Sequence, residues 1–390
     1  MKRLRTLSTT RLVALALLVA VVAAVLAAVA IAAGRGNGPV PAPKPLPQAL
    51  HDSLTATAPA GVTARIRFAN NLFPSGALGG PVGSALMSGA SGRLWATADG
   101  RGRLELQSNA GDVQVVWNQQ TVTIFDASSN TVYRASLPQH SGGSDKGGAL
   151  PSVGDIASFL TQARGHADVS AARPTNVGGQ PAYSVRVSPK HDGGLLGAAE
   201  LAWAASQPVP LRVGIYAQGA SKPVLELAAT HVTFGSVPAS DVDISPPAGA
   251  KMTDLGNLAQ RGGGKEQHPK TAATGSAAVA AAPFSAVAPA TLVGLPRQDV
   301  RLVGHGDSRA LLAVYGHGLG AIVVLEHAAN GSGSSGMLGA LPTVSLDGVT
   351  AHELATQLGT ALTWHKGGVS FVLAGSVPPA AAEAAARALG

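Results

Sequence analysis

The stretch RLELQSNAGDVQVVWN, residues 103–118, decides the fold class of this chain. Apolar and polar residues alternate along it, with Leu104, Leu106 and Trp117 on apolar positions. Alternation with a period of two is typical of an antiparallel strand that has one face in a core and one in water. The pattern recurs from 61 to 248, with turn-like sequences between the runs. The chain is therefore predicted to be mainly β with a few helices (α+β).

Two segments depart from this alternation and are predicted to be helices. The first is LPQALHDSLTAT, residues 46–57, and the second spans 151–164, where apolar residues follow helical spacing. Ser152 and Asp155 match the S-x-x-D form of a capping box at the start of the second helix. An amphipathic helix among strands must bury its apolar stripe, either on the sheet or across the mouth of a barrel.

Composition limits what the chain can do. Its 390 residues are enough for two ordinary domains, and with only 4% aromatic residues the core must be aliphatic. The chain has no Cys, which excludes disulfides, thiolate metal sites, cysteine nucleophiles and the acylated cysteine of a bacterial lipoprotein. Four charges of the net +7 lie before residue 12, and no cluster of Lys and Arg with interleaved aromatics follows, so nucleic-acid binding is not expected.

The segment from Leu12 to Ala33 is predicted to cross a membrane. Its 22 consecutive apolar residues would span about 33 Å as a helix, against a hydrocarbon core of about 30 Å. Lys2, Arg3 and Arg5 precede it and favour a cytoplasmic N-terminus. The alternative is a cleaved signal peptide, because small-x-small sites such as 28–30 occur near its end. Both readings place the remainder outside the cytoplasm, at the cell membrane if the segment is retained.

Six segments are predicted along the chain. Alternating prolines make 34–47 an extended stalk, and 249–285 is rich in small residues without a periodic pattern. The expected order is a cytoplasmic basic tail at 1–11, a transmembrane helix at 12–33, the stalk at 34–47, a first β domain at 48–248, a flexible linker at 249–285 and a small β-rich C-terminal module at 286–390.

The search for catalytic or metal-binding motifs gives no candidate. His352 and Glu353 resemble the start of H-E-x-x-H, but Thr356 stands where the second His is required. No G-x-S-x-G or G-x-x-x-x-G-K-[ST] sequence occurs. His305, His317 and His327 match no compact metal-ligand spacing. The chain is therefore expected not to be an enzyme and to need no metal or cofactor.

The apolar positions of the strands form the candidate binding surface, because apolar ligands bind to concave, mostly aliphatic surfaces. The alternative is that the same side chains fill a closed core. The candidate lining consists of Ile66, Phe68, Leu104, Leu106, Val115, Trp117, Ile124, Val185, Val213, Ile215, Leu225 and Leu227.

Four stretches of the first domain together resemble the LolA/LolB-like superfamily, which includes the RseB/MucB-like regulators of sigma factors. They are VVWNQQTVTIFDASSNTVYRASLP (115–138), GGQPAYSVRVSP (178–189), PVPLRVGIYAQG (208–219) and ELAATHVTFGSVPASDVDISPPAGA (226–250). More loosely, LTWHKGGVSFVLAGSVPPAAAEAAARAL (362–389) is similar to the C-terminal module of RseB-like proteins. The resemblance implies a curved antiparallel half-barrel whose interior takes acyl chains and whose mouth is covered by lid helices.

Three functions follow from the residues and the resemblance. The first is a membrane-anchored, LolA-like protein that accommodates the acyl chains of a lipid or lipoprotein. Carriers of that superfamily are usually released into the periplasm, whereas this chain is expected to stay tethered and to act at one membrane. The second is an RseB-like envelope sensor that binds a membrane protein such as an anti-sigma factor. The third is a structural envelope protein with a fully packed core.

Overall fold

The computed structural model describes residues 38–72, 89–109, 111–137, 151–191, 193–257, 274–304, 309–329 and 341–389. The predicted basic tail and the predicted span at 12–33 lie outside these residues, as does His305. Within the described ranges, no helix combines the length and the apolar character needed to cross a bilayer.

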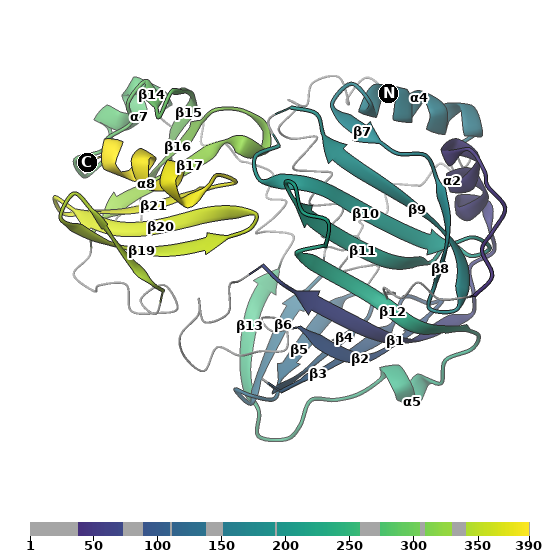
Figure 1. The fold of residues 1–390 in the computed structure, drawn as a ribbon. Coiled ribbons are helices and arrows are strands. Elements are labelled where there is room, and N and C mark those ends of the chain that lie inside the picture. The colour runs from purple at the N-terminus through teal and green to yellow at the C-terminus, as the bar shows by residue number, and fades with distance from the viewer. Residues whose placement is uncertain are drawn as a thin grey trace.

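Thirteen strands form the first sheet, which curves strongly and makes up most of the molecule (Figure 1). The order across it is β13-β6-β5-β4-β3-β2-β1-β12-β11-β10-β9-β7, and β8 also pairs with β9. Every described pairing is antiparallel except that of β13 with β6. The strands are β1 (Gly61–Asn70), β2 (Ala90–Thr97), β3 (Gly102–Ser108), β4 (Gly111–Trp117), β5 (Thr121–Asp126), β6 (Thr131–Ser136), β7 (Ala167–Val169), β8 (Arg173–Val177), β9 (Gln180–Pro189), β10 (Leu196–Ala204), β11 (Pro210–Ala217), β12 (Leu225–Phe234) and β13 (Lys251–Asn257).

Both predicted helices of the first domain are present, and the structure confirms the predicted fold class. Helix α2 covers Leu46–Thr55 and α4 covers Val153–Ala163. The Ser152 hydroxyl accepts from the Asp155 backbone and the Asp155 carboxylate accepts from the Ser152 backbone, so the capping box forms as predicted. The apolar stripes of the two helices meet each other and the rings of Tyr183 and Trp203, which lie on β9 and β10.

Eight strands form the second sheet, in the order β14-β15-β16-β17-β21-β20-β19-β18. Helix α8 (Pro379–Ala388) packs its Ala382, Ala385 and Ala386 into the core of this sheet. The sequence did not predict β19, because Glu353 interrupts the alternation of Val349, Ala351 and Ala355. The strands are β14 (Thr291–Leu292), β15 (Leu295–Val303), β16 (Ala310–Tyr315), β17 (Ile322–Ala328), β18 (Thr343–Leu346), β19 (Val349–Thr356), β20 (Gly359–Lys366) and β21 (Val369–Gly375), with a 3₁₀ turn at Gly318–Gly320 between β16 and β17.

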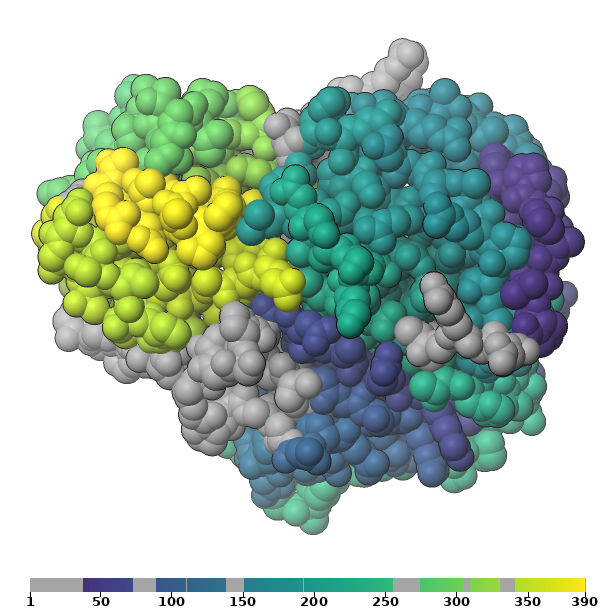
Figure 2. All heavy atoms as spheres, viewed as in Figure 1, coloured from purple at the N-terminus to yellow at the C-terminus, as the bar shows by residue number. Residues whose placement is uncertain are grey.

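The two sheets touch at the ends of β10 and β1. The Leu195 backbone N–H donates to the Ser376 carbonyl at 3.1 Å and to its hydroxyl at 2.9 Å. The Gln357 amide donates to the Asn71 carbonyl at 2.7 Å. In the space-filling view the C-terminal module sits directly against the first sheet (Figure 2).

Parts of the predicted linker carry regular structure. Strand β13 extends the first sheet by parallel pairing with β6, and the short helix α7 (Ser276–Ala280) packs on β15. The range predicted as a flexible linker therefore contains two pieces of regular structure. An edge strand held by backbone pairing does not need alternating apolar side chains, and Met252 of β13 is exposed.

The described end of the predicted stalk is bound to the first sheet. The Asn176 amide of β8 donates to the Pro39 carbonyl at 2.8 Å, and the Tyr183 hydroxyl of β9 donates to the Ala42 carbonyl at 2.6 Å. Proline-rich chain has few backbone N–H groups and leaves its carbonyls unpaired, so side chains of a neighbouring sheet can bind them. Residues 38–45 are thus a strap along the first domain, and this corrects the picture of a free spacer there.

Candidate functional site

The pairing register places all twelve predicted lining residues on one face of the first sheet, here called the inner face. Ile66 lies opposite Gly92, which lies opposite Leu106. In the other direction, Phe68 lies opposite Leu227, and Leu227 opposite Val213. Pairing and alternation carry the other seven to the same face: Leu104, Val115, Trp117, Ile124, Val185, Ile215 and Leu225.

The inner face has a packed half and an open half. On β1, β3 and β4, the side chains of Ile66, Leu106 and Trp117 are buried in the main core cluster. On β9 and β10, Val187 is 37% exposed and Leu201 38% exposed. Val185, Val213, Ile215, Leu225 and Leu227 are only partly buried. The open half is therefore an aliphatic surface along β9 to β12 that the described residues leave partly uncovered.

The sequence prediction missed Val187 and Leu201 as members of this surface. Leu201 lies directly opposite both Val185 and Val213, which were predicted. The signal was present, since Val187 continues the alternation of β9, and Leu201 and Trp203 alternate on β10. Helices α2 and α4 cover the inner face next to this surface, where Tyr183 and Trp203 lie.

The opposite, outer face carries a row of alternating charges across five strands. Glu200 of β10 pairs with Arg212 of β11 and lies 4.0 Å from Arg186 of β9. Glu226 of β12 lies 3.6 Å from Arg67 of β1. Burial raises the pKa of Glu226, and the two nearby arginines, Arg212 first, act against that rise. The Arg186 guanidinium also lies over the Tyr216 ring at 4.0 Å. This row stabilises the outer face by pairing, and its charges have partners.

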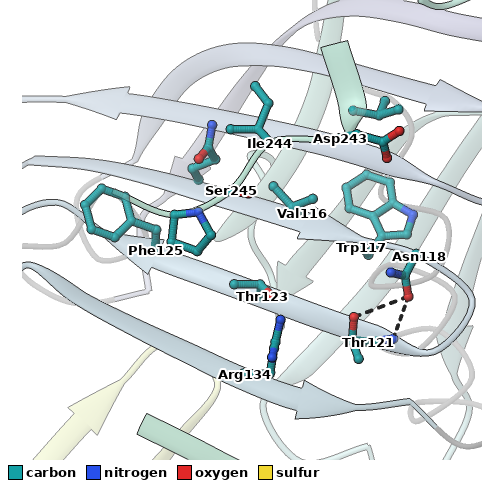
Figure 3. A pocket seen from close by; sticks show the side chains of 13 residues that line it. Val116, Trp117, Asn118, Thr121, Thr123, Phe125, Arg134, Asp243, Ile244 and Ser245 are labelled. Carbon is teal, nitrogen blue, oxygen red and sulfur yellow. Dashed lines mark hydrogen bonds between the residues drawn. The ribbon is translucent and has the colours of Figure 1, made fainter. Parts of the chain in front are cut away.

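A pocket of about 290 Å³ lies on the outer face between β4–β6 and the segment 242–246. Figure 3 shows Phe125, Thr123 and Arg134 on the strands below, with Ile244 and Ser245 crossing above them. The Asn118 side chain accepts from the Thr121 backbone and hydroxyl. The carboxylate at the rim, Asp243, is bound by Arg101 at 2.5 Å. The lining offers hydroxyls and one guanidinium and no acid–base pair.

The part of the chain that the structure describes contains no group of three or more His, Asp or Glu side chains that could hold a metal ion. His352 lies on β19, where its Nδ1 is 3.3 Å from the Leu341 carbonyl. Glu353 is half-buried and its pKa is raised, first by burial and then by Glu383. His327 is 3.0 Å from the Ala328 carbonyl through its Nδ1. These side chains do not converge on a site.

One buried carboxyl group stands out in the second sheet. Glu326 of β17 is fully buried, opposite Leu311 and Phe371. One of its oxygens accepts from the Val287 backbone at 2.8 Å, and the other has no hydrogen-bond partner. Burial raises its pKa to about 7. Burial also raises the pKa of Tyr315 to about 12, and the Glu326 carboxyl group adds to that rise.

Glu326 is expected to make the stability of the protein depend on pH. The folded state holds this proton more tightly than the unfolded state, so stability falls as the pH rises from about 4.5 to about 7. Glu326→Gln keeps the oxygen that accepts from Val287. We expect it to raise the free energy of unfolding at pH 8 by on the order of 1–3 kcal/mol and to change it little at pH 4. Chemical denaturation across this range is the measurement. The control is Asp112→Asn on the exposed part of β4, whose profile should follow the parent; an unchanged Glu326→Gln profile would contradict the expectation.

Comparisons with known proteins concern the fold. No family model matches the chain, and no curated protein matches it. Among solved structures, MucB in complex with the periplasmic part of MucA is 16% identical, with 87% of this chain and 94% of that chain covered and a TM-score of 0.41. The MucA/MucB complex of Pseudomonas aeruginosa is 16% identical over 87% of this chain and 96% of that chain, with a TM-score of 0.43. A LolA superfamily protein from Nitrosomonas europaea is 12% identical over 52% of this chain and 98% of that chain, with a TM-score of 0.21.

These structures are of the two kinds that the sequence stretches resemble. All the identities are below 20% and all three TM-scores are below 0.5. No residue role and no activity is carried over from them to this chain.

Proposed function

We propose that the first domain binds acyl chains of a lipid or lipoprotein on its inner face, outside the cytoplasm, without catalysing a reaction. The observation that carries this proposal is the open half of the inner face, where Leu201 and Val187 remain more than a third exposed. Aliphatic side chains left uncovered on a curved sheet are the surface that an acyl chain buries most favourably, at about 25 cal/mol per Å².

The proposal includes the membrane. The segment 12–33 would hold the chain at the cell membrane with its domains on the extracytoplasmic side, and the division into domains at 48–248 and 286–390 is part of the same proposal. A tethered binder would take its ligand from the membrane that holds it.

The test is a pair of charge substitutions with matched exposure. Leu201→Glu places a carboxylate in the open half, and Val323→Glu places one on β17, where the side chain is 37% exposed. Both variants are expected to fold, because both positions reach water. Native mass spectrometry of the full chain released from detergent should show bound acyl lipid on the parent and on Val323→Glu. On Leu201→Glu retention should fall at least about tenfold, since desolvating a carboxylate costs more than the 1.4 kcal/mol of that factor.

Equal retention by the parent and Leu201→Glu would exclude the open half as the site. A parent that retains no acyl lipid when purified from its native membrane would favour the structural envelope protein with a packed core.

A second candidate function is a sensor whose C-terminal module contacts a membrane protein, such as an anti-sigma factor. It is favoured by the contact of Leu195 with Ser376, because Leu195 directly precedes β10, the strand that carries Leu201. A ligand bound on β10 would therefore alter the contact between the first sheet and the second module. If ligand binding on β10 is coupled to this contact, hydrogen exchange at 194–196 should slow in the lipid-loaded full chain. Unchanged exchange would argue for a simple carrier.

A further inference from the structure

Three basic side chains lie side by side on the outer face of β12, β1 and β2. The register pairs His231 with Arg65, and Arg65 with Arg93. All three are exposed. Within the described residues, neither Arg65 nor Arg93 forms an ion pair, since the acidic residue in register with Arg93, Glu105, is bound by Arg103. We call these three residues the basic row.

The basic row is not explained by the stability of the sheet. Like charges directly opposite each other on neighbouring strands destabilise the pairing. The rest of the outer face follows the opposite rule, because Arg186, Glu200 and Arg212 alternate in sign from strand to strand. Arg67, two residues beyond Arg65, also reaches a carboxylate, that of Glu226. An arrangement that breaks the local rule without internal compensation indicates an external anion.

The position of the row points to the anion. Gly38, where residues 1–37 join the described chain, lies against Asn176 of β8. The next turn of that hairpin contacts β12, since the Gly178 carbonyl accepts from the Val232 backbone at 3.0 Å, and Val232 adjoins His231. Strands β8, β12 and β1 lie together at this side of the sheet (Figure 1). The row is therefore close to the point at which the proposed membrane anchor enters the domain.

We propose that the outer face of β12, β1 and β2 lies on the membrane, with Arg65, Arg93 and His231 bound to the headgroups of anionic phospholipids. The inference rests on the proposed membrane anchor. Guanidinium groups bind phosphate oxygens in bidentate fashion, and each arginine near an anionic bilayer surface contributes about 1 kcal/mol. Exposed side chains from three neighbouring strands can reach one plane of headgroups together.

Because the chain contains no Cys, a single cysteine can carry a fluorophore. Ser91, which lies opposite Arg67 and next to the row, is the reporting position, and Thr350 on β19 is the reference position. The full chain is incorporated into vesicles that contain an acceptor dye on their headgroups. One set is phosphatidylcholine, and the other is phosphatidylcholine with phosphatidylglycerol at about three to one. Energy transfer from each position to the headgroups is measured.

Transfer from position 91 is expected to rise at least about twofold when phosphatidylglycerol is present and to fall again at high salt, because the attraction is screened. Transfer from position 350 should not change. Arg65→Gln with Arg93→Gln should remove the rise, whereas Arg309→Gln, at an exposed position directly before β16, should preserve it.

Equal transfer in both vesicles, or a rise that survives the double substitution, would overturn the inference while leaving the anchor intact. A chain that floats with neither vesicle would overturn the anchor and the inference together. Transfer to a labelled oligoglutamate peptide without any response to phosphatidylglycerol would assign the row to an acidic protein segment and overturn the membrane assignment.

Discussion

Gly92→Ala is expected to destabilise the first sheet by about 3 kcal/mol, the upper end of what overpacking costs. A Cβ atom at position 92 would lie 1.7 Å from the Glu105 carbonyl oxygen and 2.8 Å from its carbonyl carbon. These are backbone atoms of β3, so the conflict cannot be relieved by a rotamer change. Strands β2 and β3 would have to separate in the middle of their pairing, where Gly92 lies opposite Leu106.

The control for this substitution is Gly235→Ala. A Cβ at position 235 would meet no atom within 4 Å, so its effect should stay within about 0.5 kcal/mol. Chemical denaturation followed by tryptophan fluorescence measures both variants on the full chain. Similar midpoints for the two would mean that β2 and β3 do not approach as closely as the structure has them.

The second large effect separates the two halves of the inner face. Leu106 is 2% exposed and packs in the core cluster of the first sheet, so Leu106→Ala should cost about 2–5 kcal/mol. Leu201 is 38% exposed and loses fewer neighbours, so Leu201→Ala should cost about 1 kcal/mol. The effect on ligand binding should be the reverse of the effect on stability. Acyl retention should fall in Leu201→Ala and persist in Leu106→Ala.

Thermal unfolding and acyl retention are measured on both variants under the same conditions. Equal stability losses would show that the face is uniformly packed, and a retention loss confined to Leu106→Ala would place the ligand on β1 to β4 instead.

The sequence was sufficient for the strands that show clear alternation and for the face on which their side chains lie. Alternation is a local property, so Leu104 and Leu106 could be assigned to one face before the sheet was known. The same holds for α4, because Ser152 and Asp155 are three residues apart and cap the helix locally.

What could not be predicted depends on pairing between distant segments. Strand β1 pairs with β12, so Arg65 lies opposite His231, which is far from it in the sequence. No local sequence pattern predicts this pairing. The burial of Glu326 is similar, since residues 284–288 cover it from outside its own strand. The difference between Leu106 and Leu201 follows from the curvature of the sheet and the placement of α2 and α4, which no single strand encodes.

The strap at residues 38–45 has a mechanical consequence. A force applied to the chain before Gly38 is first resisted by the bonds of Asn176 and Tyr183 to the Pro39 and Ala42 carbonyls. Only after both have broken does the load reach Lys44, which is held to Asp52 of α2 at 2.5 Å. Helix α2 is thus protected from tension on its N-terminal side, because the sheet carries that load first.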